Sequence, residues 1–156
     1  MNKIISVDQA IEISNSLKRQ GKKIVICGGV FDIIHLGHIK FLEEAGKQGD
    51  ILFLLVESDK KVKETKGNDR PVNNQELRVI NLSLLKNVSF VIPLPFFETN
   101  NEYDQLVVQI KPDIIATTNP DPFLFHKERQ AKMIGAKVVE VINLIPNIST
   151  TEILKK

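Results

Sequence analysis

Hydrophobic positions along the chain form two kinds of pattern that alternate from one end to the other. Short, uniform runs of Val, Ile, Leu and Phe are typical of strands that are buried on both faces of a parallel sheet. Longer stretches carry apolar residues at helical spacing between polar ones. The short runs predict strands at residues 23–27, 51–56, 88–92, 113–116 and 137–142. The longer stretches predict helices at residues 7–20, 37–48, 74–86, 103–110 and 125–134, with a short final helix from residue 149.

Polar residues beside these runs indicate where the elements begin and end. Ser6 and Gln9 have the spacing of a capping box, which predicts the start of the first helix, and Gly21 ends that helix. The lysine-rich stretch after the second strand, through residues 66–71, is polar and is expected to be a loop. On the helix at 74–86, the apolar side is expected to carry Leu77, Ile80, Leu84 and Leu85.

Strands that alternate with helices predict an α/β fold. We expect a Rossmann-like open parallel sheet of five strands, with right-handed crossovers and helices on both faces. The length of 156 residues suits one domain, 1–156, made of a leading helix at 1–21 and a core at 22–156.

Composition mainly narrows the range of partners. The net charge of +2 is too small to indicate nucleic acid. No apolar run approaches the roughly 18 residues of a membrane span, and the N-terminus lacks a signal-peptide pattern, so we expect a cytoplasmic protein. Cys27 is the only cysteine, which excludes a disulfide within the chain. A local group of lysines fits either a phosphorylated small molecule or a solvated surface: Lys60, Lys61, Lys63 and Lys66.

The strongest candidate chemistry lies directly after the first predicted strand. His35 and His38, two of the three histidines in the chain, stand three residues apart around Gly37, where helical spacing begins. Ligands of open parallel sheets bind beyond the carboxyl ends of strands, and helix N-termini suit phosphate. Two imidazoles on one side of such a turn favour a polyphosphate. A zinc site would need further ligands, and His126 is the only other histidine, so no metal site is expected.

Residues 29–38 (GVFDIIHLGH) resemble the first signature of the cytidylyltransferase-like nucleotidyltransferase superfamily. Residues 148–151 (ISTT) resemble its second signature, the Ser/Thr-rich start of the last helix. Between them, residues 66–72 (KGNDRPV) and the pair Glu76 and Arg78 are similar to the adenylyltransferase domain of bacterial ADP-heptose synthase. The resemblance extends over nearly the whole chain and agrees with the predicted fold.

This resemblance implies transfer of a nucleoside monophosphate from a nucleoside triphosphate to a phosphorylated sugar or polyol, such as heptose 1-phosphate, with release of pyrophosphate. ATP is favoured by residues 66–72. The alternatives are a CTP-dependent cytidylyltransferase acting on glycerol 3-phosphate or a similar phosphate, and a flavin- or pantetheine-type adenylyltransferase. A catalytically inactive nucleotide-binding module is an alternative of another class. Mg²⁺ would arrive with the nucleotide, and a homodimer is expected.

The resemblance also implies roles for particular residues. His35 and His38 would bind the triphosphate and stabilise the transition state, and Lys66 would neutralise phosphate charge from a loop. Asp32 is expected to brace its turn, and Arg78 either to reach a phosphate or to pair with Glu76. The full set of expected nucleotide-binding residues is Gly29, Val30, Phe31, Gly37, Arg78, Ser149, Thr150 and Thr151.

The sequence departs from the resembling group at several points. Residues 117–122 (TTNPDP) stand where the resembling group has a segment similar to Lys-Gly-Gly-Asp-Tyr, so the acceptor is allowed to differ from heptose phosphate. The candidate base or acceptor contacts in this segment are Thr117, Thr118, Asn119 and Asp121. The basic residue that often precedes the Ser-Thr-Thr signature is missing, and residues 145–147 (IPN) stand in its place. Lys86 stands at a position where the glycerol-phosphate cytidylyltransferase branch resembles a pattern with arginine. Phe96 and Phe97 are expected to contact a second subunit, line the acceptor pocket or anchor their loop.

Overall fold

The computed structural model describes residues 2–146 and 150–154 of the chain. Within this part the helices are α1 (Val7–Arg19), α2 (Leu36–Gly46), α3 (Asp59–Lys66), α4 (Gln75–Ser83), α5 (Asn100–Ile110), α6 (Leu124–Ile134) and α7 (Thr150–Leu154). The strands are β1 (Ile24–Gly29), β2 (Ile51–Val56), β3 (Phe90–Pro93), β4 (Ile114–Asn119) and β5 (Lys137–Asn143). No helix in these ranges combines the length and the apolar character needed to cross a membrane.

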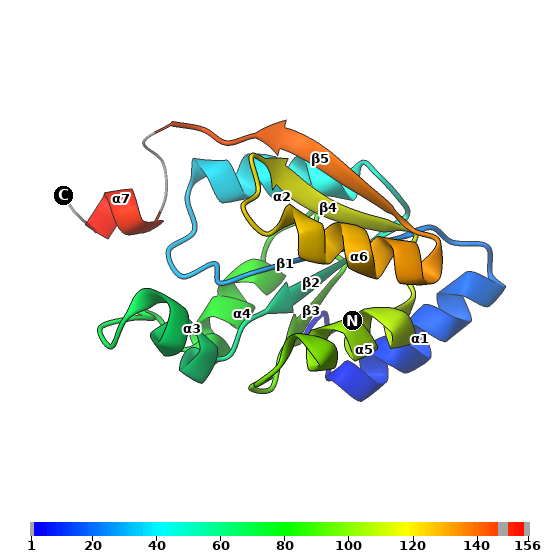
Figure 1. Cartoon of the computed structure of the whole chain (residues 1–156), viewed down its shortest axis with the longest axis horizontal. Helices are drawn as coiled ribbons and strands as arrows, with labels where there is room; N and C mark the ends of the chain where they lie inside the picture. Colours follow the sequence, from blue (N-terminus) through cyan, green and yellow to red (C-terminus); the bar gives the residue numbers. More distant parts are fainter. Residues whose placement is uncertain (1, 147–149, 155–156) are drawn as a thin grey trace.

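The strands form one parallel sheet in the order β3-β2-β1-β4-β5, which confirms the predicted Rossmann-like fold. β1 lies at the centre of this sheet. The chain adds β2 and β3 on one side of β1 and then crosses over to add β4 and β5 on the other (Figure 1). A parallel sheet has its ligand crevice where the strand order reverses, at the carboxyl ends of the strands. The topology therefore places the candidate site between β1 and β4.

Each face of the sheet has its own hydrophobic cluster, because successive strand residues point to opposite faces. One cluster joins Val25 and Leu54 to α2 and α4. The other joins Ile26 and Phe53 to α1, α5 and α6, and it includes the fully buried Ala10 of α1. The helix α1 begins as predicted, since Ser6 and Gln9 cap it reciprocally.

The polar segment after β2 differs from its prediction. Residues 59–66, which we expected to be a loop, form the helix α3. Its only buried residue is Val62, so the segment lacks the apolar period that marks most helices. The backbone N–H of Lys61 donates to the Ser58 hydroxyl at 3.1 Å, and this cap supplies the start that the apolar pattern did not reveal.

The orientation of α4 was also predicted wrongly. Three of the four leucine and isoleucine side chains assigned to its apolar side are exposed: Leu77, Ile80 and Leu84. Only Leu85 packs against the core. The helix instead turns inward the side that carries Arg78, Val79 and Leu82. An arginine with ionic and carbonyl partners can be buried, and hydrophobic periodicity cannot anticipate that.

Candidate active site

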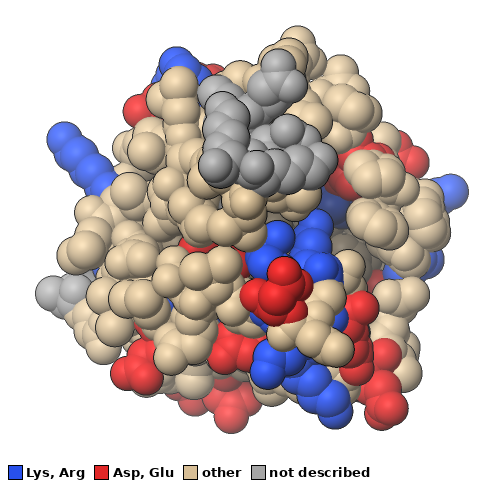
Figure 2. Space-filling view, turned by 90° about the vertical axis from the view of Figure 1, so that its left-hand side faces the viewer, with Lys and Arg blue, Asp and Glu red and all other residues tan. Residues whose placement is uncertain are grey.

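A cavity of about 380 Å³ lies at the carboxyl ends of β1, β4 and β5, where α2 begins. Predicted site residues from four separate segments line it together: His35, His38, Lys66, Thr117, Asp121 and Thr151. Gly29, Val30, Phe31, Gly37 and Thr118 line it as well. Figure 2 looks onto the end of the molecule that carries α3 and α7, and Lys and Arg side chains gather near the centre of that face with acidic ones beside them.

The loop between β1 and α2 is built so that its backbone comes close to the cavity. Phe31 has a φ of 52°, in the left-handed region that non-glycine residues rarely adopt. Phe31 is only 5% exposed, and its ring lies over Gly29, where an added Cβ would come within 2.8 Å of the ring. Gly29 is therefore required because a side chain would displace Phe31.

The two histidines form a stacked pair at the start of α2. Their ring centroids lie 3.8 Å apart, at an interplanar angle of 21°. His35 is the N-cap residue of α2, and its Nδ1 accepts from the backbone N–H of Gly37 at 3.1 Å. In the neutral ring the proton must then be on Nε2, so His35 has a donor left for a ligand. His38 Nδ1 accepts a longer bond of 3.4 Å from the backbone N–H of His35.

Both imidazoles are held in their neutral form near pH 7. Burial lowers the pKa of His38 to about 4, and the charge of His35 acts in the same direction, against a hydrogen bond with the Ile33 backbone. Burial also lowers the pKa of His35. His35 can therefore donate its Nε2–H to a phosphate oxygen, and the stacked rings avoid the mutual repulsion of two cations.

Asp32 braces the loop, as the sequence predicted. Its Oδ2 accepts from the Val72 backbone at 2.7 Å and from Arg70 Nε at 3.0 Å, and its Oδ1 accepts from the Asn73 backbone at 2.8 Å. Burial alone would raise the pKa of Asp32, but these three donors hold it below its ordinary value. The carboxylate thus joins the β1–α2 loop to the segment ahead of α4 while remaining ionised.

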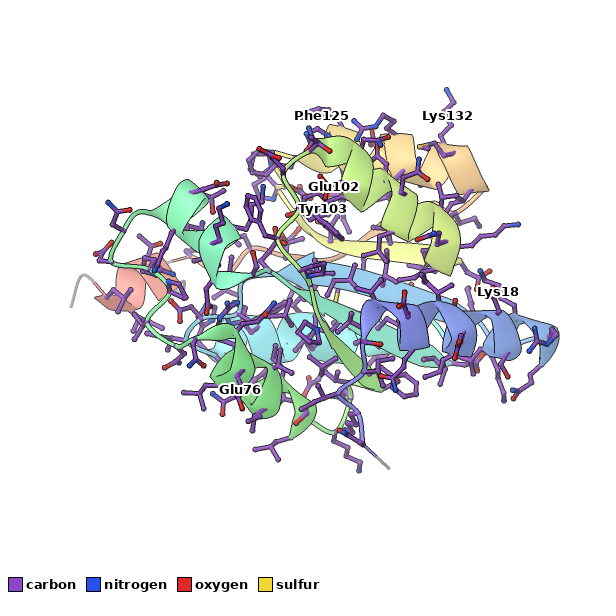
Figure 3. All side chains as sticks on the ribbon, turned by 90° about the horizontal axis from the view of Figure 1, so that it is seen from below. Lys18, Glu76, Glu102, Tyr103, Phe125 and Lys132 are labelled. Carbon is purple, nitrogen blue, oxygen red and sulfur yellow. The ribbon has the colours of Figure 1, made fainter. Side chains whose placement is uncertain are left out.

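Arg78 lies beneath this loop and does not line the cavity. Its fully buried guanidinium donates to the Val30 carbonyl at 2.8 Å, to the Asn73 carbonyl at 3.0 Å and to Asp59 Oδ1 at 2.7 Å. The ion pair is therefore with Asp59, and the alternative pairing with Glu76 is wrong, since Glu76 lies on the outer side of α4 (Figure 3). In this structure Arg78 holds the loop that lines the cavity.

The opposite wall of the cavity comes from the end of β4 and from α6. Asp121 Oδ2 accepts from Thr117 Oγ1 at 2.6 Å and from Lys127 Nζ at 2.7 Å, and Oδ1 accepts from the Phe123 backbone at 2.8 Å. Burial would raise the pKa of Asp121, but the donors, with Lys127 first, lower it. Asn119 is not part of the cavity lining, and its side-chain amide donates to Asn143 Oδ1 at 3.2 Å.

Several parts of the site were missed or cannot be placed. Arg70 and Lys127 line the cavity but were not among the predicted site residues. Arg70 lies within the segment 66–72 that carried the family resemblance, which was a usable signal, whereas nothing in the sequence links Lys127 to Asp121. Ser149 and the side chain of Thr150 lie outside the described part of the chain, so Thr151 is the one residue of the predicted Ser149, Thr150 and Thr151 set whose side chain the structure describes.

Phe96 and Phe97 lie away from the cavity lining. Phe97 packs edge-on against Tyr103, with ring centroids 4.9 Å apart, and Tyr103 lies on the side of α5 that faces the sheet (Figure 3). Lys60 Nζ covers the ring of Phe96 at 4.1 Å from its centroid. Of the three roles proposed for this pair, the contacts within the chain support the loop anchor.

Together, the fold and this cavity define a Rossmann-like protein with a nucleotidyltransferase type of site. The chain belongs to the cytidylyltransferase-like family, whose pattern matches residues 26–156. Membership in this family, together with the similarity to the relatives below, supports a nucleotidyltransferase enzyme.

Curated relatives include bifunctional proteins HldE. The protein from a Nitratiruptor species is 38% identical over 147 residues, which cover 92% of this chain and 29% of that one. The protein from Campylobacter fetus subsp. fetus is 36% identical over 157 residues, or 99% of this chain and 31% of that one. The chain thus spans under a third of the length of these relatives.

Solved structures show the same architecture. The lipopolysaccharide core biosynthesis protein from Thermoplasma volcanium superposes with a TM-score of 0.64 at 28% identity, over 80% of this chain and 98% of that chain. Pantoate-beta-alanine ligase from Francisella tularensis gives a TM-score of 0.66 at 17% identity, over 99% of this chain and 76% of that chain. The second similarity concerns the fold alone.

Proposed function

We propose that the chain transfers the nucleoside monophosphate of ATP to the phosphate of a phosphorylated sugar or polyol, such as heptose 1-phosphate, and releases pyrophosphate. The observation that carries this proposal is the cavity in which the neutral His35–His38 pair meets the cations Lys66, Arg70 and Lys127. Imidazole N–H groups, cations and the start of a helix are the donors that a polyphosphate needs.

The nucleotide would lie across the reversal point of the sheet. Its phosphates would lie at the beginning of α2, near His35 and His38, and extend toward Thr151. Its base would lie on the apolar surface that Ala116, Ile142 and Leu144 contribute to the cavity, because heterocyclic bases bind to apolar walls with a few polar contacts at the edge.

The reaction itself needs no protein nucleophile. An anionic oxygen of the acceptor phosphate attacks the α-phosphorus and forms a new P–O bond. The bond from the α-phosphorus to the bridging oxygen breaks, and pyrophosphate leaves with the electron pair. Catalysis of such a step depends on positioning and on stabilising the charge that develops. His35 Nε2–H and the lysine cations supply these interactions.

Magnesium would accompany the triphosphate. In residues 2–146 and 150–154, no group of three or more His, Cys, Asp and Glu side chains lies together as a metal cage would require. This fits an ion that is held mainly by phosphate oxygens and water, as Mg²⁺ prefers. The ion would neutralise phosphate charge, and the chain's own residues would orient the acceptor and exclude water.

A two-stage experiment tests this function. The first stage compares the thermal midpoint with ATP, CTP, GTP and UTP in the presence of Mg²⁺, since a ligand of the folded state raises the midpoint. The second stage measures pyrophosphate release with heptose 1-phosphate and with glycerol 3-phosphate. We expect ATP to give the largest shift and heptose 1-phosphate to give turnover.

Other outcomes of this experiment point to different functions. A shift by CTP with turnover on glycerol 3-phosphate would support a cytidylyltransferase. Nucleotide binding without pyrophosphate release would support a binding module, an interpretation that the altered wall at residues 117–122 favours. If no triphosphate shifts the midpoint at millimolar concentration, the nucleotide site is refuted.

We also propose a homodimer, on the family resemblance. The exposed side chains Leu77, Ile80 and Leu84 support it, because their spacing places them on one side of α4. Light scattering after size-exclusion chromatography at micromolar concentration measures the mass directly. A monomeric mass would contradict the dimer without affecting the proposed reaction.

A further inference from the structure

The guanidinium of Arg70 is only half used by the protein. Its Nε donates to Asp32 Oδ2, and the side chain is 8% exposed. No described residue accepts a hydrogen bond from its Nη1 or Nη2. Arg70 also lines the cavity, so the donors of Nη1 and Nη2 that no described residue uses lie where a ligand in the cavity can meet them.

The anchoring of Arg70 fixes the direction of this free edge. Asp32 is fully buried at its side chain and is itself held by the Val72 and Asn73 backbones. Because the carboxylate bonds to Nε alone, the terminal fork of Nη1 and Nη2 is not engaged by Asp32. The fork matches two oxygens of a phosphate, which a lysine cannot bind in the same two-pronged way.

The position of Arg70 within the fold selects among the phosphates that could reach it. Arg70 belongs to the segment between α3 and α4, which joins β2 to β3 and approaches the cavity from the β2 side of β1. The apolar surface of Ala116, Ile142 and Leu144 comes from β4 and from the end of β5, on the other side of β1, and the histidine pair stands at the start of α2, which follows β1 itself. A nucleotide with its base on that surface leaves the Arg70 side for the second substrate.

We propose that Arg70 binds the phosphate of the acceptor through Nη1 and Nη2, with Asp32 as its positioning residue. This assignment rests on the proposed nucleotidyl transfer and adds to it the contact that recognises the acceptor. Lys66 approaches the same side from the end of α3 and contributes charge, whereas the fork of Arg70 fixes the orientation of the attacking oxygen.

The variant Arg70→Lys tests the fork while keeping the charge. With ATP and heptose 1-phosphate, or whichever pair gives turnover, we expect KM for the acceptor to rise at least about ten-fold. KM for the nucleotide should stay within about two-fold. Arg129→Lys is the matched control, because Arg129 pairs with Asp104 between α6 and α5 and does not line the cavity. A rise in the nucleotide KM alone, or no change in either KM, would overturn the proposal.

Asp32→Asn tests the positioning role separately. It keeps Arg70 but removes the anionic partner of Nε, so we expect the acceptor KM to rise while the nucleotide KM stays within about two-fold. Thermal midpoints of all variants establish that they fold. If Asp32→Asn is unfolded, Arg70→Lys alone decides; an unchanged acceptor KM in a folded Asp32→Asn enzyme would refute the positioning role.

The assignment stays testable even if the wild-type chain proves to have no turnover. Inorganic phosphate is then titrated into protein saturated with a non-hydrolysable ATP analogue, and the thermal midpoint is followed. We expect a shift in the wild type and in Arg129→Lys that is lost in Arg70→Lys. Equal shifts in all three, or none in the wild type, would refute the phosphate subsite, whereas absence of turnover with an intact shift refutes only the proposed reaction.

Discussion

The two walls of the cavity are held in different ways. The wall from β1 and α2 is fastened by residues that are distant in sequence: Asp32 bonds to residues 70–73, and Arg78 bonds to Val30 across 48 positions. The wall from β4 and α6 is held locally, since Thr117, Asp121 and Lys127 bond within ten positions of one another. The first wall carries the family signature, and the second is where the sequence departs from it.

Because the two walls are held differently, we expect them to contribute to different properties of the enzyme. A network of long-range bonds fixes the histidine loop relative to the rest of the sheet, so a change there disturbs geometry at the reacting phosphorus. A local network can be replaced as a unit without affecting the remainder of the fold. We therefore expect changes in the first wall to affect turnover and stability, and changes in the second to affect substrate preference.

The largest effect should come from His38 in the first wall. His38→Ala removes the buried ring that stacks on His35 and lines the cavity where the phosphates are proposed to bind, and kcat should fall by about three orders of magnitude, which corresponds to about 4 kcal/mol. Pyrophosphate release measures the rate, and circular dichroism verifies the fold. His126→Ala is the matched control, because His126 lies on α6 outside the cavity lining. A folded His38→Ala enzyme with full activity would remove the histidine pair from the mechanism.

The next largest effect should come from Arg78, which tests the fastening of the same wall. Arg78→Met leaves the carbonyls of Val30 and Asn73 without their donor and leaves Asp59 unpaired. Because Asp59 is partly exposed, we expect a loss near the lower end for buried ion pairs, about 3 kcal/mol in the free energy of unfolding. Denaturant titration measures it, with Arg129→Met as control. A loss below about 1 kcal/mol would show that the loop does not depend on this network.

The two walls also differ in how far the sequence predicted them. The β1–α2 loop, its histidines and the bracing role of Asp32 were predictable, because they lie in one continuous stretch at a strand end. The contacts of Arg70 and Lys127 were not, since Arg70 bonds to Asp32 across 38 positions, and Lys127 reaches Asp121 six positions away, a spacing that neither a helix nor a strand repeats. The role of Arg78 was not predictable either, because its partner Asp59 lies 19 positions away in the helix α3, which the sequence did not predict.

The fold was predicted more completely than the site. The run at 51–56 matches β2 at both ends, because uniform apolar strands of a covered parallel sheet have a clear signal. Prediction failed at α3 and at the orientation of α4. Helix α3 begins at the Ser58 cap with little apolar pattern, and α4 buries Arg78 with its carbonyl and carboxylate partners, which hydrophobic periodicity cannot predict.

Acid should lower the free energy of unfolding by less than Arg78→Met does, because His38 of the first wall is buried in its neutral form. The pKa of His38 is lowered to about 4, so between that value and its ordinary 6.5 the unfolded chain binds a proton that the folded chain does not. Stability is therefore full above pH 6.5 and falls with decreasing pH, by about 2 kcal/mol between pH 7 and pH 5. Urea titrations at the two pH values measure this difference in stability. In His38→Gln, which has no group that titrates at this position, most of the difference should disappear. Equal stability of the wild type at both pH values would contradict the burial of a neutral His38.

The smallest effect on stability should come from Lys127 in the second wall. Lys127→Met removes the cation from a buried Asp121 carboxylate that keeps its bonds from Thr117 and the Phe123 backbone, so we expect a loss of about 1.5 kcal/mol. The same change exposes the Asp121 carboxylate to the ligand, so the ratio of kcat/KM for ATP to that for CTP should change about ten-fold. Lys132→Met is the matched control, since Lys132 is exposed on the same helix (Figure 3). A large loss of stability with an unchanged nucleotide ratio would mean that this wall is structural as well, and the division between the two walls would not hold.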